Sequence, residues 1–160
     1  MIKKLFEQIK NIPLWAVPLY GVVVLIISYT FEYGFGYLPC QLCLWQRFPW
    51  FGIAIIGSII LIYPHTAKYL LKLCVLIMII SLGLAVFNTG IEYGFWTGLD
   101  GCSSNTELVT QTSALLNSLE NEAVIRCDEP VWTLFGISMA GYNALLSLDA
   151  LILFYLMDKK

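Results

Sequence analysis

Four long apolar stretches constrain the fold of this chain more than any other feature. They cover about residues 14–31, 44–63, 73–89 and 134–157, and a helix needs roughly 20 apolar residues to cross a bilayer core. Charged residues make up only 12% of the 160 residues, against about a quarter in soluble domains. The sequence therefore predicts one all-α membrane domain over residues 1–160, a four-helix transmembrane bundle in the lipid bilayer. The net charge of −2, with no basic tract, argues against a nucleic-acid partner.

The first apolar stretch has an alternative interpretation as a secretory signal peptide, because it follows the basic residues Lys3, Lys4 and Lys10. A signal peptide has a shorter apolar region and ends in small residues. Here the apolar region is long, and the bulky residues 29–33 follow it. We therefore interpret the stretch as a membrane span.

Basic residues predict the orientation, since cytoplasmic segments of membrane proteins carry an excess of Lys and Arg. Seven of the nine lie in the N-terminal segment, in the turn between the second and third spans and in the C-terminal tail. The other two, Arg47 and Arg126, belong to the opposite side. We expect both termini in the cytoplasm and outer loops over residues 32–43 and 90–133. In the second outer loop, the partial apolar face of residues 107–121 favours a short helix on the membrane surface.

This topology sorts the five cysteines. Cys40, Cys43, Cys102 and Cys127 lie on the outer side, where disulfides persist. Cys74 lies at the cytoplasmic end of the third span, and we interpret it as a small apolar residue. Four cysteines allow three pairings, and the most economical one joins Cys40 with Cys43 and Cys102 with Cys127.

The Cys-x-x-Cys motif at the start of the second span has a setting typical of reactive thiols. Arg47 follows Cys43 by one helical turn and would lie on the same face. Thiolates are the reactive species, and a helix N-terminus or a nearby cation stabilises them. A cation at this depth is also costly unless it has a partner. We interpret Cys40 and Cys43 as a redox-active dithiol and Arg47 as a functional residue; the alternative for Arg47 is a side chain that snorkels to the interface.

Other uses of these cysteines fit the sequence less well. A four-cysteine zinc site usually has two Cys-x-x-Cys pairs, whereas twenty-four residues separate Cys102 from Cys127. A c-type haem attachment needs His directly after the second cysteine, and Leu44 stands there. We therefore expect no metal at these residues. A purely structural disulfide stays open as an alternative for both pairs.

The combined pattern resembles the DsbB family of bacterial inner-membrane thiol oxidases. The resemblance rests on the four spans, the Cys-x-x-Cys motif with Arg47 four residues later, the cysteine pair in the last outer loop and the segment WTLFGISM at residues 132–139. It implies a multi-pass protein of the inner (cytoplasmic) membrane with its cysteine pairs on the periplasmic side. Such a protein supports disulfide bond formation in exported proteins.

The resemblance also implies a role for each functional residue. Cys102 and Cys127 would oxidise a periplasmic thioredoxin-fold, DsbA-like thiol oxidase, and the partner's thiol would attack Cys102. Electrons would then pass to Cys40 and Cys43 and on to a bound quinone, ubiquinone or menaquinone, from the membrane quinone pool. Cys43 would engage the quinone and Arg47 would polarise it. The implied enzyme is a protein-disulfide:quinone oxidoreductase.

Three polar residues are open within this framework. Asn88 falls where many relatives carry His, so a histidine-based proton role near the quinone would be absent, and Glu92 is the candidate substitute. Asp149 lies inside the fourth span, toward the cytoplasmic side. We interpret Asp149 as an inward-facing polar contact rather than part of a proton path.

Two other functions are kept as alternatives. A thiol–quinone enzyme resembling vitamin K epoxide reductase would carry its Cys-x-x-Cys motif at the start of the fourth span, whereas here the motif opens the second. A non-enzymatic membrane scaffold would use its disulfides only to stabilise the fold. Thiol oxidation with added quinone separates the enzyme from the scaffold.

Overall fold

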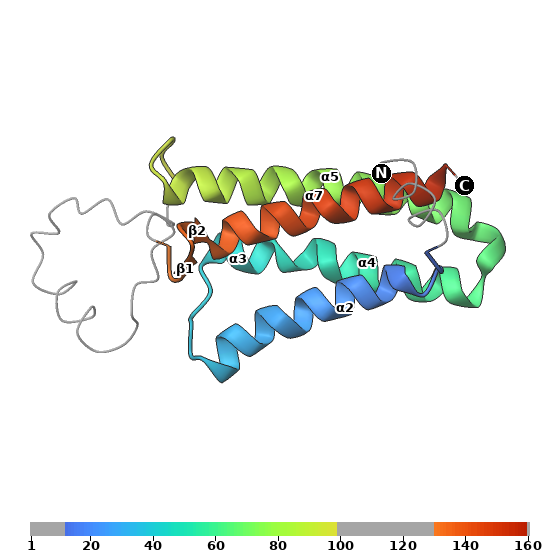
Figure 1. The fold of residues 1–160 in the computed structure, drawn as a ribbon, viewed down its shortest axis with the longest axis horizontal. Coiled ribbons are helices and arrows are strands. Elements are labelled where there is room, and N and C mark those ends of the chain that lie inside the picture. The colour runs from blue at the N-terminus through green and yellow to red at the C-terminus, as the bar shows by residue number, and fades with distance from the viewer. Residues whose placement is uncertain (1–11, 99–129, 160) are drawn as a thin grey trace, which may run out of the picture.

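The chain forms an antiparallel bundle of four long helical segments (Figure 1). The computed structural model describes residues 12–98 and 130–159. Their elements, in chain order, are α2 (Ala16–Tyr29), the π-helix η1 (Thr30–Gly34), α3 (Gln41–Trp45), α4 (Arg47–Ile62), the 3-10 helix η2 (Pro64–Thr66), α5 (Ala67–Glu92), β1 (Thr133–Leu134), β2 (Ile137–Ser138) and α7 (Met139–Asp158). The surface helix predicted over residues 107–121 lies outside the described residues.

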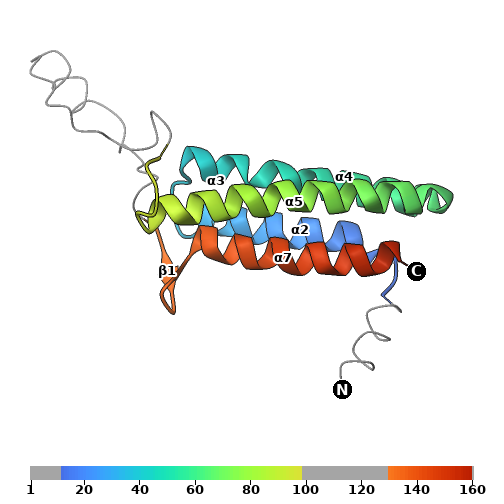
Figure 2. The same ribbon diagram turned by 90° about the horizontal axis from the view of Figure 1, so that it is seen from above.

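Helices that follow one another in the chain are neighbours in space. α2 packs along α4, α4 along α5, and α5 along α7, and the start of α2 and the end of α7 share one end of the bundle (Figure 2). Four segments are long and apolar enough to cross a membrane: Ala16–Gly34, Gln41–Ile62, Pro64–Glu92 and Met139–Asp158. The predicted all-α four-helix membrane bundle is confirmed.

The third helix begins earlier than its apolar stretch indicates. α5 starts at Ala67, whereas the uncharged stretch starts at about residue 73. The extra turns carry Lys68 and Lys72, and both are exposed at the end of the bundle opposite α3. Charged residues can belong to a membrane helix where its end reaches water, so hydropathy alone shortens the predicted span.

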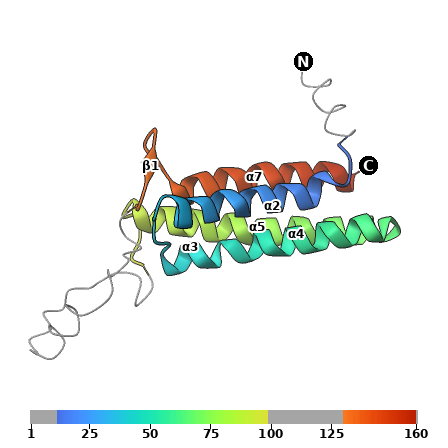
Figure 3. The same ribbon diagram turned by 90° about the horizontal axis from the view of Figure 1, so that it is seen from below.

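A β-hairpin occupies the residues that hydropathy assigns to the start of the fourth span. Thr133 pairs with Ser138 in antiparallel register, and Phe135 and Gly136 form the turn with φ angles of 51° and 77°. Positive φ at both turn residues matches the twist of a two-residue hairpin. The hairpin projects from the bundle (Figure 3), and α7 starts after it, where the Ser138 hydroxyl accepts a hydrogen bond from the Gly141 N–H at 3.1 Å.

The bundle core consists of large apolar side chains from all four helices. Trp50 and Ile53 of α4 and Phe154 of α7 are at most 2% exposed. Cys74 of α5 is fully buried in the same core, so it faces the bundle rather than lipid. Gly57 lets α2 approach α4 closely, because small residues at helix interfaces bring backbones together.

Candidate functional site

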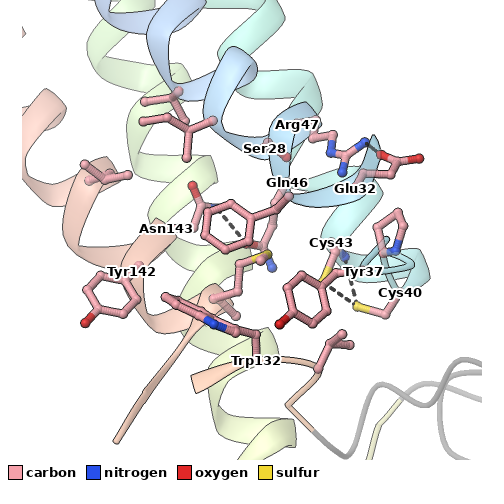
Figure 4. A pocket seen from close by; sticks show the side chains of 18 of the residues that line it. Ser28, Glu32, Tyr37, Cys40, Cys43, Gln46, Arg47, Trp132, Tyr142 and Asn143 are labelled. Atoms are coloured by element: carbon pink, nitrogen blue, oxygen red, sulfur yellow. Dashed lines mark hydrogen bonds and ion pairs between the residues drawn. The ribbon is translucent and has the colours of Figure 1, made fainter. Parts of the chain in front are cut away.

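The two cysteines of the Cys-x-x-Cys motif meet at the start of α3 (Figure 4). Cys40 is the N-cap residue, and its Sγ accepts a hydrogen bond from the Cys43 backbone N–H at 3.2 Å. A capping side chain turns back over the first turn of its helix, and here this brings the Sγ atoms of Cys40 and Cys43 to 2.6 Å from each other. Cys40 is buried and Cys43 is half-buried. The helix start itself therefore assembles the dithiol that the sequence predicts.

Cys43 is held against the end of α5. The Asn88 Nδ2 donates a hydrogen bond to the Cys43 Sγ at 3.7 Å, and Ile91 and Phe87 pack against the same pair of cysteines. Asn88 is fully buried. An N–H donor favours negative charge on sulfur, so Asn88 supplies at this sulfur a polar contact that cannot exchange a proton at neutral pH.

Arg47 has a buried partner that the sequence did not identify. Its Nη1 donates to the Glu32 Oε2 at 2.5 Å, and its guanidinium lies 4.8 Å from the centre of the Tyr29 ring. The side chains of Arg47 and Glu32 are 11% and 18% exposed. The Arg47 Nε is buried and has no hydrogen-bond partner among the described residues. A paired and enclosed guanidinium argues against the snorkelling alternative.

A cavity of about 290 Å³ opens beside the dithiol (Figure 4). Its wall combines apolar and aromatic side chains of α2, α4 and α7 with a few polar groups, which is the usual composition of a ligand pocket. Cys40, Cys43 and Arg47 border it. Further polar or aromatic residues in its lining include Glu32, Gln46, Trp50, Glu92 and Asn143.

Two of these polar residues connect α4 to α7 across the cavity. The Asn143 Nδ2 donates to the Gln46 Oε1 at 2.6 Å, and the Trp50 Nε1 donates to the Asn143 Oδ1 at 2.9 Å. Gln46 lies between α3 and α4, where the helix is interrupted. No local sequence pattern identifies Gln46 or Asn143 as partners, because they are ninety-seven positions apart.

Glu92 borders the cavity from the end of α5. The Glu92 Oε2 is buried without a hydrogen-bond partner in the described part of the chain. Glu92 and Asn88 are four residues apart on one helix, so they share a face. The structure thus brings the predicted substitute Glu92 to the cavity that Cys43 borders.

The remaining predicted residues lie elsewhere. Cys102 and Cys127 are outside the described residues. Asp149 accepts a hydrogen bond from the Tyr20 hydroxyl at 2.9 Å, so it makes the expected polar contact, but it is exposed on the bundle surface and does not face inward. Residues 12–98 and 130–159 contain no group of three or more His, Cys, Asp or Glu residues that could hold a metal ion.

One signal in the sequence could have identified the partner of Arg47. Glu32 is the sole acidic residue in the predicted first outer loop, and Arg47 is the sole basic residue near the outer end of the first two spans. Antiparallel neighbouring spans bring these two positions to the same depth. A buried cation requires a counter-charge there, so the topology alone favours this pair.

Four apolar helices, a dithiol at one end and a cavity beside it define a membrane protein of the thiol–disulfide class. The sequence pattern of the family described as "Disulfide bond formation protein DsbB" matches residues 10–157, and the chain belongs to this family. The family carries out disulfide bond formation as membrane-bound thiol oxidases, so the chain is a disulfide oxidoreductase.

One relative matches almost the whole chain. An uncharacterized protein of Rickettsia prowazekii (strain Madrid E) is 30% identical over 153 residues, which cover 94% of this chain and 87% of that protein. No solved structure matches the chain.

Proposed function

We propose that the protein is a thiol:quinone oxidoreductase that re-oxidises a periplasmic, thioredoxin-fold, DsbA-like dithiol protein. The electrons would pass from Cys102 and Cys127 to Cys40 and Cys43 and then to ubiquinone or menaquinone. The observation that carries the proposal is the cavity that Cys43 borders. It is the kind of site that a quinone head group requires, within the membrane bundle and next to a dithiol.

The residues around the cavity fit a quinone. A quinone ring is apolar and its two carbonyl oxygens accept hydrogen bonds. The Gln46 Nε2 and the Arg47 Nε are both buried donors without a protein acceptor among the described residues, and both residues line the cavity. Unsatisfied buried donors cost about 1–3 kcal/mol each, and carbonyl acceptors in the cavity would remove that cost.

A bound quinone supplies a two-electron oxidant inside the bilayer. Exchange with the partner's dithiol would proceed through a mixed disulfide at Cys102, leaving the partner oxidised and two electrons and two protons on this chain. A second exchange would move them to Cys40 and Cys43. These two thiols would return to a disulfide by releasing two electrons and two protons toward the cavity.

The direction of electron flow supports a quinone as the final acceptor. A DsbA-type partner is a strong oxidant with a reduction potential of about −120 mV, whereas structural disulfides have potentials below roughly −300 mV. The chain can therefore keep re-oxidising such a partner only if a stronger oxidant takes the electrons from Cys40 and Cys43. Quinones occur in the bilayer, which is the solvent of this bundle.

The charge distribution supports a location in the bacterial inner membrane with both termini in the cytoplasm. Lys68 and Lys72 lie in the first turns of α5, and Cys40 and Cys43 lie at the start of α3. These two helix starts are at opposite ends of the bundle (Figure 2). The positive-inside rule assigns the lysine end to the cytoplasm. The cysteine end then faces the periplasm, where thiol oxidation is useful to exported proteins.

The test is oxidation of a reduced thioredoxin-fold partner by the purified full chain in detergent, with decylubiquinone or a menaquinone analogue added. We expect quinone reduction, seen by its ultraviolet absorbance, in step with loss of partner thiols, and at least a hundredfold loss of rate in Cys43→Ser. Cys74→Ala is the control and should keep the rate, because Cys74 lies in the bundle core away from the cavity. No quinone-dependent turnover with either quinone would refute the proposal and leave the scaffold alternative.

A further inference from the structure

Three side chains form a hydrogen-bonded chain from the bundle core to the cavity. It runs from the Trp50 indole through the Asn143 amide to the Gln46 amide, with distances of 2.9 Å and 2.6 Å between the bonded atoms. Trp50 is 2% exposed and Gln46 is 5% exposed. All three residues line the cavity, and Figure 4 shows Asn143 and Gln46 meeting there from different helices.

Chemistry fixes the order of donors and acceptors along this chain. An indole N–H can only donate, whereas an amide side chain has one acceptor end and one donor end. Trp50 therefore requires the oxygen of Asn143, which leaves the Asn143 NH₂ to face Gln46. The Asn143 NH₂ in turn requires the oxygen of Gln46, so the group that Gln46 has left is its NH₂.

The remaining NH₂ group of Gln46 is the one without a partner. Its Nε2 is buried and has no hydrogen-bond partner within residues 12–98 and 130–159. A buried amide donor costs free energy unless an acceptor satisfies it. Because the rest of the amide is already used, only an acceptor inside the cavity can bond to this nitrogen.

From this geometry we propose that Gln46 donates a hydrogen bond to a carbonyl oxygen of the quinone, and that Asn143 and Trp50 are positioning residues that hold the Gln46 amide as a donor. The proposal rests on the proposed function, since it names a contact within the same cavity. Gln46 would thus be a neutral donor in addition to Arg47. Trp50 sets the orientation of the Gln46 amide through its hydrogen bond to Asn143. The site would thus select oxidised ligands with a carbonyl acceptor at this position.

The test uses direct binding to the full chain in detergent, kept oxidised and without a dithiol partner, so that no quinone is consumed. The probe is decylubiquinone labelled with ¹³C at its carbonyl carbons. A hydrogen bond lowers the carbonyl stretching frequency, so difference infrared spectra should contain a down-shifted band. In Gln46→Met that band should return toward the free value, and the Kd should rise about tenfold, as expected for one lost hydrogen bond.

Two nearly isosteric variants test the positioning residues. In Asn143→Asp, an ionised carboxylate accepts hydrogen bonds from both Trp50 and Gln46, which turns the oxygen of Gln46 toward the cavity. The loss of quinone affinity and of the down-shifted carbonyl band should therefore equal or exceed that in Gln46→Met. In Trp50→Phe, the Asn143 amide is free to rotate by 180°, and the loss of quinone affinity should be smaller. Trp45→Phe is the matched control, because Trp45 is exposed and does not border this cavity.

The outcomes separate this proposal from the proposed function. A chain that binds quinone, with the same Kd and the same carbonyl band in Gln46→Met, would show that water satisfies the Gln46 nitrogen and would overturn the contact. A chain without any substitution that neither binds nor reduces quinone would overturn the proposed function and the contact together. Thermal unfolding identifies misfolded variants; if Gln46→Met fails to fold, Asn143→Asp decides, and an unchanged carbonyl band in that variant overturns the contact.

Discussion

At the residue scale, the ion pair between Arg47 and Glu32 is largely buried, with side chains 11% and 18% exposed. Removing one partner of a buried pair leaves an uncompensated charge and typically costs about 3–5 kcal/mol. Arg47→Met and Glu32→Gln should each lower the thermal midpoint in detergent by several degrees. The double variant should recover much of this loss, because it leaves neither charge unpaired. Lys72→Met is the control, since Lys72 is exposed on α5.

Enzyme kinetics distinguish a role of this pair in stability from a role of Arg47 in quinone binding. Arg47→Met should raise the apparent KM for quinone, and the double variant should keep that high KM even though its stability returns. The reason is that the Arg47 Nε, which has no protein acceptor in the described residues, is lost in both variants. A double variant with a normal KM would assign Arg47 to stability alone.

The dithiol has Asn88 beside it, at the position where we expect His in many relatives. Asn88 donates to the Cys43 sulfur but does not titrate, whereas Glu92 does and borders the same cavity. Because Asn88 and Glu92 are four residues apart on α5, one helix face carries both a contact to the sulfur and a carboxyl group at the cavity. The proton role that the sequence suggests for Glu92 stays a prediction.

At the scale of elements, Gly57 controls how closely α2 packs on α4. A Cβ at this position would lie 2.5 Å from the Pro18 nitrogen and 2.9 Å from its Cα, so the backbone of α2 would have to move. Gly57→Ala should therefore destabilise the protein by about 1–3 kcal/mol, as overpacking does, with a lower thermal midpoint in detergent.

Gly52 on the same helix is the matched control. The nearest atom to its added Cβ is the Ile77 Cδ1 at 3.6 Å, which is an ordinary contact. Alanine is favoured over glycine in helices by about 1 kcal/mol, so Gly52→Ala should be neutral or stabilising. Equal losses in Gly52→Ala and Gly57→Ala would show that the close approach of α2 does not limit stability.

The elements also show which parts of the structure could be predicted. Apolar length is a local property, so four spans follow from the sequence. The hairpin at residues 133–138 does not, because its two strands have two residues each and merge with the apolar stretch of α7. The topology and the charges indicate the pair of Arg47 and Glu32. The contact of Gln46 with Asn143 depends on helix packing that no local pattern encodes.

At the scale of the whole molecule, the bundle keeps its chemistry at one end. The dithiol lies at the start of α3, and the cavity lies beside it. The start of α2 and the end of α7 share the opposite end of the bundle (Figures 2 and 3), where the first turns of α5 carry the exposed Lys68 and Lys72. A core of tightly packed apolar side chains fills the bundle between the two ends. Among the described cysteines, Cys74 is buried in the core and Cys40 and Cys43 lie at the start of α3. The orientation of the bundle therefore decides which compartment this dithiol faces.

Orientation can be measured with single cysteines placed at the two ends. In a chain whose outer-end cysteines are replaced by Ser, Thr133→Cys marks the hairpin and Lys159→Cys marks the end of α7; both positions are exposed. In spheroplasts with an intact inner membrane, a membrane-impermeant maleimide should label Thr133→Cys at least tenfold more than Lys159→Cys, and lysis should make the two equal. Cys74 is fully buried and should stay unlabelled in both. The reverse pattern would place the dithiol in the reducing cytoplasm, where a thiol oxidase could not serve exported proteins.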